Sequence, residues 1–181
     1  MLRLASSSQT RAHLLKEAGI EFLQENVDFD EEKIVALNPK NFVYQATLGK
    51  YRTNLKAFGY EDYPLLVADT VVTSQAQILR KAKCKDDARN ILMTQSGNTT
   101  SIITCMIYQS PKQKIVDISS TDYVFDVFDL DLLDSYLESG EWRGKAGACM
   151  VEGFCKQYIK KVHGFESTAM GLNVEVLKAF I

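Results

Sequence analysis

Strand-like and helix-like segments alternate along this 181-residue sequence, which predicts a mixed α/β fold. Two observations favour that class. Apolar residues make up 46% of the chain and charged residues 24%, as is typical of globular proteins. Short β-rich runs are also interleaved with stretches in which apolar residues recur at helical spacing. At about 150 residues per domain, residues 1–181 predict a single domain, undivided or in two lobes, with no independent linker.

The chain begins with a predicted strand, a serine-rich turn and a helix. Leu2 and Leu4 alternate with polar neighbours, as in a short strand. The serines at 6–8 supply a helix N-cap, and Gly19 is placed to end that helix. This arrangement points backbone N–H groups at the end of the strand, where an anion can bind.

The next elements are an acidic segment, a long helix and a buried strand. Residues 20–37 are predicted to be irregular. Asn38-Pro39 begins a helix that we expect to run to about residue 57, because proline suits the first turn. The apolar run at 65–68 predicts a buried strand that delivers Asp69 at its end, with Val71-Val72 continuing it.

The second half predicts a long strand pair among further helices. Its expected elements are a helix at 86–94, antiparallel strands at 99–108 and 115–128, a helix at 129–139, a glycine-rich loop at 140–154, a strand at 158–162, and a terminal helix at 174–180 capped by Asn173.

Charge and composition exclude several classes of function. Lys and Arg total 21 against 23 Asp and Glu, a net charge of −2, which disfavours a protein that coats duplex nucleic acid. No apolar run is long enough for a membrane span, and the first residues do not resemble a signal peptide, so a cytoplasmic protein is expected. The four cysteines lack C-x-x-C spacing and are predicted to be reduced thiols. With two histidines, a metal here should be a hard cation held by carboxylates and phosphate oxygens.

Two acidic residues are the first candidates for chemistry. Asp69 directly follows a predicted buried strand, so its carboxylate must be solvated, paired or bound to a cation. A turn aspartate is the alternative. Glu31 lies in the acidic segment, where a solvated charge cluster is the ordinary interpretation.

Four cationic residues could accompany these acids: Arg11, Lys50, Lys81 and Lys145. Each alone is more often surface decoration. Together with the serine-rich turn they could gather a polyphosphate, while the two acids hold a divalent cation or position water. Trp142 is equally compatible with a core position and with stacking on a base.

Several segments resemble the Maf family of nucleoside triphosphate pyrophosphatases. The VADTVV segment at 67–72 and GKAG at 144–147 are similar to the most specific family motifs. The supporting matches are LASSSQTRAHLL at 4–15, VDFDE at 27–31, ILRK at 78–81 and QSGNTTSIIT at 95–104.

The resemblance implies a fold, a reaction and a set of roles. The fold would be a Maf/Ham1-like elongated mixed β-sheet with flanking helices, with two lobes around a central cleft. The reaction would be hydrolysis of a nucleoside triphosphate to the monophosphate and pyrophosphate with Mg²⁺ or Mn²⁺. By motif match, Asp69 would be the central catalytic acidic residue, as metal ligand or general base, and Glu31 the second acidic residue and metal ligand. The other implied roles are Lys50 and Lys81 on the phosphates, Ser6, Ser8 and Arg11 in the phosphate-facing turn, and Thr70 and Glu152 near the base.

The chain departs from the family pattern where specificity is decided. The family's Pro-Arg-Arg is Gln9-Thr10-Arg11, and its I-Q-G glutamine is Glu152. A carboxylate only accepts hydrogen bonds, so Glu152 favours a base edge with N–H donors, such as guanine or 7-methylguanine. Thr70-Val71-Val72 follows the pyrimidine-type pattern, which ranks dTTP or UTP slightly ahead. The family's histidine and proline are Thr100 and Ala82, which leaves attenuated activity open.

Three functions therefore remain. The first is the pyrophosphatase, in which water attacks the α-phosphorus and pyrophosphate leaves. The second is a nucleotide-binding regulator of cell division with little catalysis. The third is a structural dimerisation module, whose interface Trp142 and the other aromatic residues could form. The resemblance allows a homodimer, because family members often form dimers. No membrane or duplex nucleic acid partner is expected.

Overall fold

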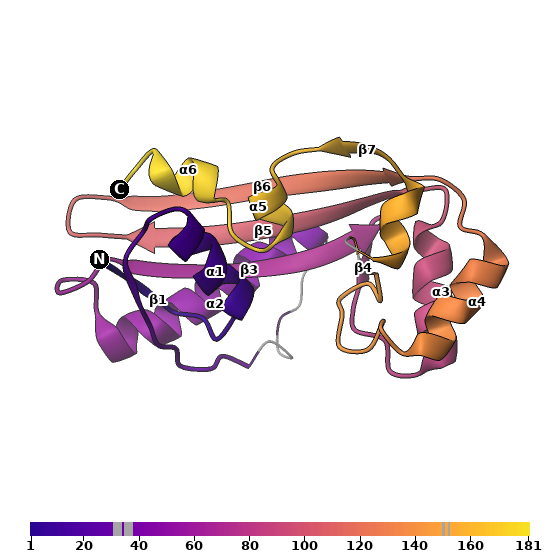
Figure 1. The fold of residues 1–181 in the computed structure, drawn as a ribbon. Coiled ribbons are helices and arrows are strands. Elements are labelled where there is room, and N and C mark those ends of the chain that lie inside the picture. The colour runs from indigo at the N-terminus through magenta and orange to yellow at the C-terminus, as the bar shows by residue number, and fades with distance from the viewer. Residues whose placement is uncertain (31–33, 35–37, 150, 152) are drawn as a thin grey trace. The chain divides into compact units, whose positions relative to one another are not determined.

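A computed structural model describes residues 1–30, 34, 38–149, 151 and 153–181 of the chain (Figure 1). The predicted α/β class is confirmed. A seven-stranded mixed sheet has the order β2-β1-β3-β5-β6-β7, and β4 pairs with β3. In chain order the elements are β1 (Leu2–Leu4), α1 (Gln9–Glu17), β2 (Phe22–Gln24), α2 (Pro39–Phe58), β3 (Leu65–Ser74), β4 (Gln77–Leu79), α3 (Lys85–Gln95), β5 (Thr99–Gln109), β6 (Lys114–Phe125), α4 (Leu130–Ser139), the 3₁₀ helix η1 (Phe154–Tyr158), β7 (Ile159–His163), α5 (Glu166–Ala169) and α6 (Val174–Lys178).

The chain divides into two compact units. The first unit contains residues 1–70, 103–120 and 165–181, and the second contains residues 71–102 and 121–164. The three long strands β3, β5 and β6 contribute residues to both units.

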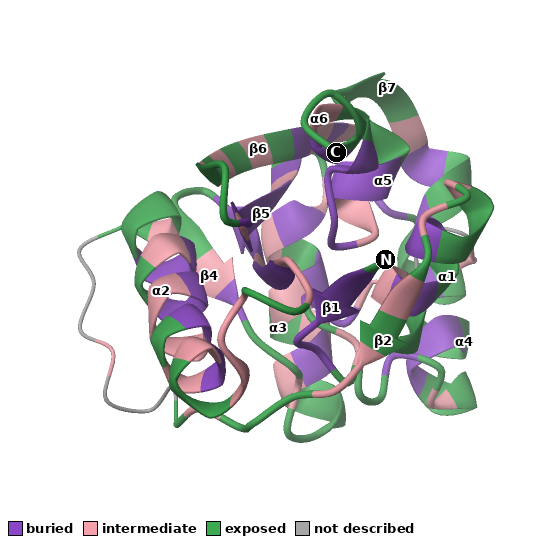
Figure 2. Cartoon of the chain, turned by 90° about the vertical axis from the view of Figure 1, so that its left-hand side faces the viewer, coloured by how far each residue is buried: buried purple, intermediate pink, exposed green. Residues whose placement is uncertain are grey.

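The first unit is built around parallel strands. β1 pairs in parallel with β2 on one side and with β3 on the other. Figure 2 shows β1 as buried, whereas β2 is half-buried or exposed because it lies at the edge. Parallel pairing on both sides explains why β1 is buried along its whole length, Arg3 included. The first four residues of β3 are likewise buried, and all four are apolar.

Successive residues of β3 point to opposite faces of the sheet, and each face has its own core. Leu66 and Ala68 pack with residues of α1 and α6. Leu65 and Val67 pack with Tyr51 of α2. The long helix therefore covers one face of the sheet, and the two shorter helices cover the other.

Local capping signals set the helix boundaries. The Ser8 side chain caps α1 by accepting the N–H of Arg11, and Gly19 follows the helix with a φ of 72°. Asn38, Asp129 and Asn173 cap α2, α4 and α6 in the same way. These positions confirm the predicted starts of all four helices.

The second unit contains β4, α3, α4 and β7, with an aromatic cluster in its core. Phe128, Phe154 and Tyr158 contact one another, and Tyr136 stacks on Phe154. Trp142 is 1% exposed and donates its indole N–H to the carbonyl of Leu137 at 3.0 Å. The tryptophan is therefore a core residue of this unit.

Three expectations need correction. β2 occupies part of the segment predicted to be irregular, because its backbone pairs with β1. Asp69 lies inside β3 instead of at the end of a strand, because the β-branched residues that follow it continue the strand to Ser74. Cys149 and Cys155 form a disulfide with a Cα–Cα distance of 6.2 Å, so only Cys84 and Cys105 are free thiols.

Within the part of the chain that the structure describes, none of the helices combines the length and the apolar character that a membrane crossing requires.

Candidate functional site

The serine-rich turn joins β1 to α1 through a compact set of hydrogen bonds. The hydroxyl oxygen of Ser6 accepts the N–H of Ser8 at 3.2 Å and Nη1 of Arg11 at 3.0 Å. Neither bond uses the Ser6 proton, which can therefore be donated to a ligand oxygen. The turn thus has the geometry that the sequence predicts for an anion site at the start of α1.

Arg11 is fixed from three directions. Besides its bond to Ser6, its Nε donates to the carbonyl of Gly171 at 2.8 Å and its Nη2 donates to the hydroxyl of Thr70 at 3.2 Å. The backbone of Gly171 has a φ of 103°, and a Cβ there would lie 3.3 Å from both Arg11 Nε and Thr70 Oγ1. Glycine at this position leaves room for the planar guanidinium.

A chain of hydroxyl groups continues from Arg11 into the core. Thr104 is fully buried and donates its single proton to the carbonyl of Thr168 at 2.8 Å. Its 2.9 Å contact with Thr70 must then use the Thr70 proton. Thr70 is consequently an acceptor toward Arg11. The buried carbonyl thus fixes the direction of the bonds made by Thr104 and Thr70, while the guanidinium of Arg11 can only donate.

Lys50 and Asp69 form an ion pair between α2 and β3. The ammonium nitrogen lies 2.7 Å from Oδ1 of Asp69, and the two side chains are 23% and 11% exposed. Burial of a carboxylate requires such a partner, because an isolated buried charge is costly. The structure brings these two predicted residues together.

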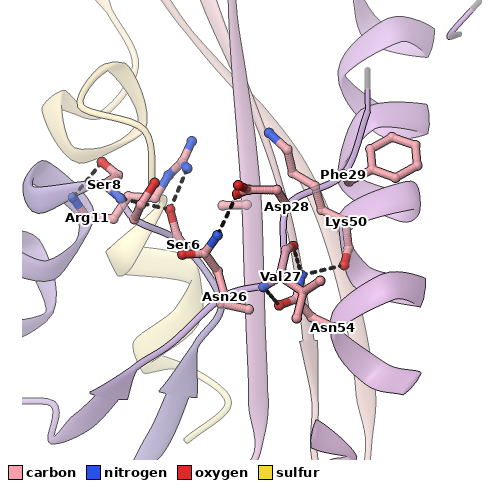
Figure 3. Close-up of a pocket in the computed structure, with 12 residues that line it drawn as sticks. Ser6, Ser8, Arg11, Asn26, Val27, Asp28, Phe29, Lys50 and Asn54 are labelled. Atoms are coloured by element: carbon pink, nitrogen blue, oxygen red, sulfur yellow. Dashed lines mark hydrogen bonds between the residues drawn. The ribbon is translucent and has the colours of Figure 1, made fainter. Parts of the chain in front are cut away.

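A pocket of about 270 Å³ adjoins this ion pair in the first unit (Figure 3). The turn contributes Ser6, Ser8 and Arg11 to its lining, and α2 contributes Lys50. Figure 3 shows Ser6, Ser8 and Arg11 on one side and Lys50 on the other, with Asn26 and Asp28 between them. The remaining lining residues are Ala5, Ser7, Asn26, Val27, Asp28, Phe29, Asn54 and Ala68.

The loop after β2 adds residues that the sequence does not single out. Asn26 donates to the Asp28 carboxylate at 2.9 Å, which places a further acid at the pocket. Asn54 is 1% exposed and bonds to the backbone of Val27. In the sequence Asn54 is only an asparagine one helical turn after Lys50, and nothing there distinguishes a buried position from an exposed one.

The donor chemistry of the first unit is compatible with a hard cation that also binds phosphate. Among the residues that the structure describes, no group of three or more His, Cys, Asp or Glu side chains is arranged to hold a metal ion. Mg²⁺ commonly takes only one or two protein carboxylates and completes its shell with substrate phosphates and water. Asp69 fits that requirement. The predicted second ligand, Glu31, lies outside the described residues, as does Glu152.

Lys81 and Lys145 belong to the second unit, where backbone pairing brings their segments together. Lys81 forms an isolated antiparallel bridge with Ala146, and Gly147 donates its N–H to Arg80 at 3.1 Å. Lys81 is exposed and Lys145 is half-buried. Two distant motifs are thus adjacent within this unit.

Gln95 fixes the glycine-rich loop in the second unit. It is fully buried and donates to the carbonyl of Gly147 at 2.7 Å. Its oxygen accepts the hydroxyl of Thr100 at 3.4 Å, so the residue that replaces the family's histidine is a buried structural group here. A buried glutamine at the end of an amphipathic helix was not distinguishable from an exposed one in the sequence.

Cys105 is a buried thiol close to the site. Burial is the main reason that the pKa of this thiol is raised to about 11. The hydrogen bond with Thr47 lowers the pKa by a smaller amount, and the charges of Asp117 and Asp69 raise it. The thiol is therefore protonated at neutral pH and is not a nucleophile in this state.

Comparisons with known proteins test the resemblance to a family. The family model described as Maf-like protein matches residues 1–181. A protein of a Nitratiruptor species, named nucleoside triphosphate pyrophosphatase, is 55% identical over 179 residues, which cover 98% of this chain and 96% of the relative. Proteins with the same name from Helicobacter pylori and Campylobacter jejuni are 40% and 38% identical, over 97% and 100% of this chain and 92% and 100% of their own length. This chain belongs to the Maf-like protein family.

Proposed function

We propose that this protein hydrolyses a nucleoside triphosphate to the monophosphate and pyrophosphate. The observation that carries the proposal is the pocket of the first unit, where an anion-binding turn and Arg11 share the lining with Lys50, the partner of a buried aspartate. The names of the relatives from Nitratiruptor and Helicobacter support the same reaction.

Each group at the pocket has a role in this reaction. Ser6, Ser8 and Arg11 bind phosphate oxygens, because a fixed guanidinium and a helix start both favour anions. Asp69 accepts the proton of the attacking water or orients that water, and Lys50 keeps the carboxylate in place. Phosphoryl chemistry depends mainly on such positioning and charge neutralisation.

A divalent cation is part of the proposal. Asp69, together with Glu31 and the substrate's own phosphate oxygens, would hold Mg²⁺ or Mn²⁺, which supplies charge neutralisation at the phosphates. By motif match Lys81 would engage the phosphates, and Lys145 of the glycine-rich loop would meet phosphate oxygens. Thr70 and Glu152 would contact the base, and the preferred base is left to experiment.

The decisive experiment is a panel of ordinary and modified nucleoside triphosphates, incubated with the protein and Mn²⁺ and analysed for monophosphate and pyrophosphate. Turnover is expected, with loss on adding a chelator. Asp69→Asn should reduce turnover by at least about 10²-fold. Asp62→Asn, at an exposed aspartate in the same unit, is the matched control and should match the parent.

Two results would contradict the proposal. Binding of a triphosphate without turnover would favour the nucleotide-binding regulator instead. Equal turnover in Asp69→Asn and Asp62→Asn would remove Asp69 from the mechanism.

A further inference from the structure

Phe29 packs against α2 at the one glycine of that helix. A Cβ on Gly49 would lie 2.3 Å from Cζ of Phe29 and 2.4 and 2.7 Å from its two Cε atoms. Such distances do not occur between real atoms, so the ring can occupy this place only because residue 49 has no side chain. Figure 3 shows the ring of Phe29 directed at α2.

The helix itself gives no reason for a glycine at this position. Gly49 lies in the interior of α2, where glycine is the least favourable residue apart from proline. It does not have the positive φ that eight other glycines of the chain have, so alanine suits its backbone. A glycine at residue 49 therefore serves the contact with Phe29, because only a residue without a side chain leaves room for the ring.

Asn54 holds the same segment one helical turn further along. Its Oδ1 accepts the N–H of Val27 at 2.8 Å, and its Nδ2 donates to the carbonyl of Val27 at 3.1 Å. Nδ2 also donates to the carbonyl of Lys50 at 2.8 Å, which fixes the amide on the helix. One buried side chain thus pairs with both backbone groups of Val27.

The clamped segment contains a residue that lines the pocket. Asp28 lies between the two anchored residues, Val27 and Phe29, and shares the pocket lining with Lys50. Both anchors on α2, Gly49 and Asn54, are close to Lys50 along the helix. A shift of the segment relative to α2 would change the distance between the Asp28 carboxylate and the cations of the pocket.

We propose that Gly49 and Asn54 are positioning residues, which hold the segment of Val27, Asp28 and Phe29 against α2 so that Asp28 and Lys50 face the same phosphate-binding pocket. The inference rests on the proposed pyrophosphatase function. It adds Asp28 as an acid that lines the described pocket and assigns the placement of Asp28 to two residues of α2 that act through the segment.

Gly49→Ala is the first test. The added methyl group must displace the tip of the Phe29 ring, which can move with its loop while the helix stays intact. We expect kcat to fall by about 10²-fold, because small displacements at a reacting centre have effects of this size. The midpoint of thermal unfolding should stay equal or rise, because alanine favours the helix. A merely structural role would not lower kcat while preserving the fold.

A double-mutant cycle identifies the contact responsible. In a Phe29→Ala background the methyl group of Gly49→Ala meets no ring, so the second substitution should change kcat by less than about twofold. An equal loss of kcat in both backgrounds would overturn the role of Phe29 and Gly49.

Hydrogen exchange tests the clamp without reference to activity. Asn54→Ala and Gly49→Ala should both speed exchange in a peptide that contains the Val27 amide, whereas Asn41→Ala, at an exposed asparagine of the same helix, should not. Unchanged exchange in both test variants would refute the proposal even if activity changed.

The failure of the proposed function would be visible separately. A parental protein that turns over no triphosphate would refute the pyrophosphatase and, with it, the role of the clamp in turnover. The exchange measurement would still decide whether Gly49 and Asn54 hold the segment. Faster exchange with unaltered kcat would refute the positioning role alone.

Discussion

Lys50 places its ammonium nitrogen 2.7 Å from Oδ1 of Asp69, which connects the interior of α2 to the interior of β3. The carboxylate is the less exposed partner, at 11% for its side chain against 23% for the lysine. It therefore depends on this contact more than the lysine does. A shift of α2 on the sheet would therefore change the position of the Asp69 carboxylate, the proposed catalytic group, through this ion pair.

Lys50→Met should reduce both stability and turnover. Methionine keeps the apolar stem but removes the cation, which leaves Asp69 without this partner. The free energy of unfolding should fall by about 2 kcal/mol, the size expected for a hydrogen bond to a charged group. Urea denaturation measures this loss. Lys56→Met, at an exposed lysine of α2, is the control and should stay within about 0.5 kcal/mol of the parent. Equal stabilities for the two variants would show that the ion pair contributes nothing.

Thr104→Val tests the hydroxyl chain that ends at Arg11. Valine preserves the shape but leaves the carbonyl of Thr168 and the proton of Thr70 without their partner. The free energy of unfolding should fall by about 1–3 kcal/mol. KM for the triphosphate should rise, because the Thr70 hydroxyl that accepts from Arg11 loses the acceptor that orients it. Denaturation and steady-state kinetics measure the two effects.

The matched control for this substitution is Thr73→Val. Among the described residues, Thr73 Oγ1 is a buried hydroxyl oxygen with no hydrogen-bond partner. Its replacement by a methyl group should be neutral or stabilising, because no hydrogen bond is lost. If both valine variants lost the same stability, the chain of hydroxyl groups would not account for the effect of Thr104.

Two glycines of the loop in the second unit should respond differently to alanine. Gly144 and Gly147 have φ values of 74° and 69°, so alanine is strained at both, by about 1 kcal/mol. At Gly147 the new Cβ would also lie 3.1 Å from Cγ1 of Val72, whereas at Gly144 it meets nothing within 4 Å. Gly147→Ala should therefore lose about 1–3 kcal/mol more than Gly144→Ala in urea denaturation. Equal losses would show that Val72 can move away without cost.

The predicted elements that the structure confirms are those with local signals. Ser8 as the cap of α1 and Asn38-Pro39 at the start of α2 could be recognised because a capping side chain acts within its own turn. β2 was missed because its only strong interaction is backbone pairing with β1, about twenty residues earlier in the chain, and three residues show no usable period.

The same distinction holds at the site. The sequence singled out Lys50 and Asp69, and the structure joins them. Nothing in the sequence indicates a role for Asn54 or Thr104, because their partners Val27 and Thr168 are 27 and 64 residues away. A polar residue at a helical or strand position becomes informative only when its distant partner is known. The position of the Phe29 ring against Gly49 is another contact between residues that are far apart in the sequence.

The two free thiols should differ in reactivity and in their effect on stability. Cys84 is exposed, whereas burial raises the pKa of Cys105 to about 11 from an ordinary value of 9.0. Iodoacetamide at pH 8 should therefore label Cys84 and spare Cys105 in the native protein, which mass spectrometry of peptides measures.

Between about pH 9 and pH 11 the unfolded chain loses the Cys105 proton before the native chain does. Fewer protons are then bound in the unfolded state, so this thiol makes stability fall as pH rises through that window. Cys105→Ala should show a shallower fall in urea midpoint over the same range. Equal labelling of both thiols in the native protein would contradict the burial on which this prediction depends.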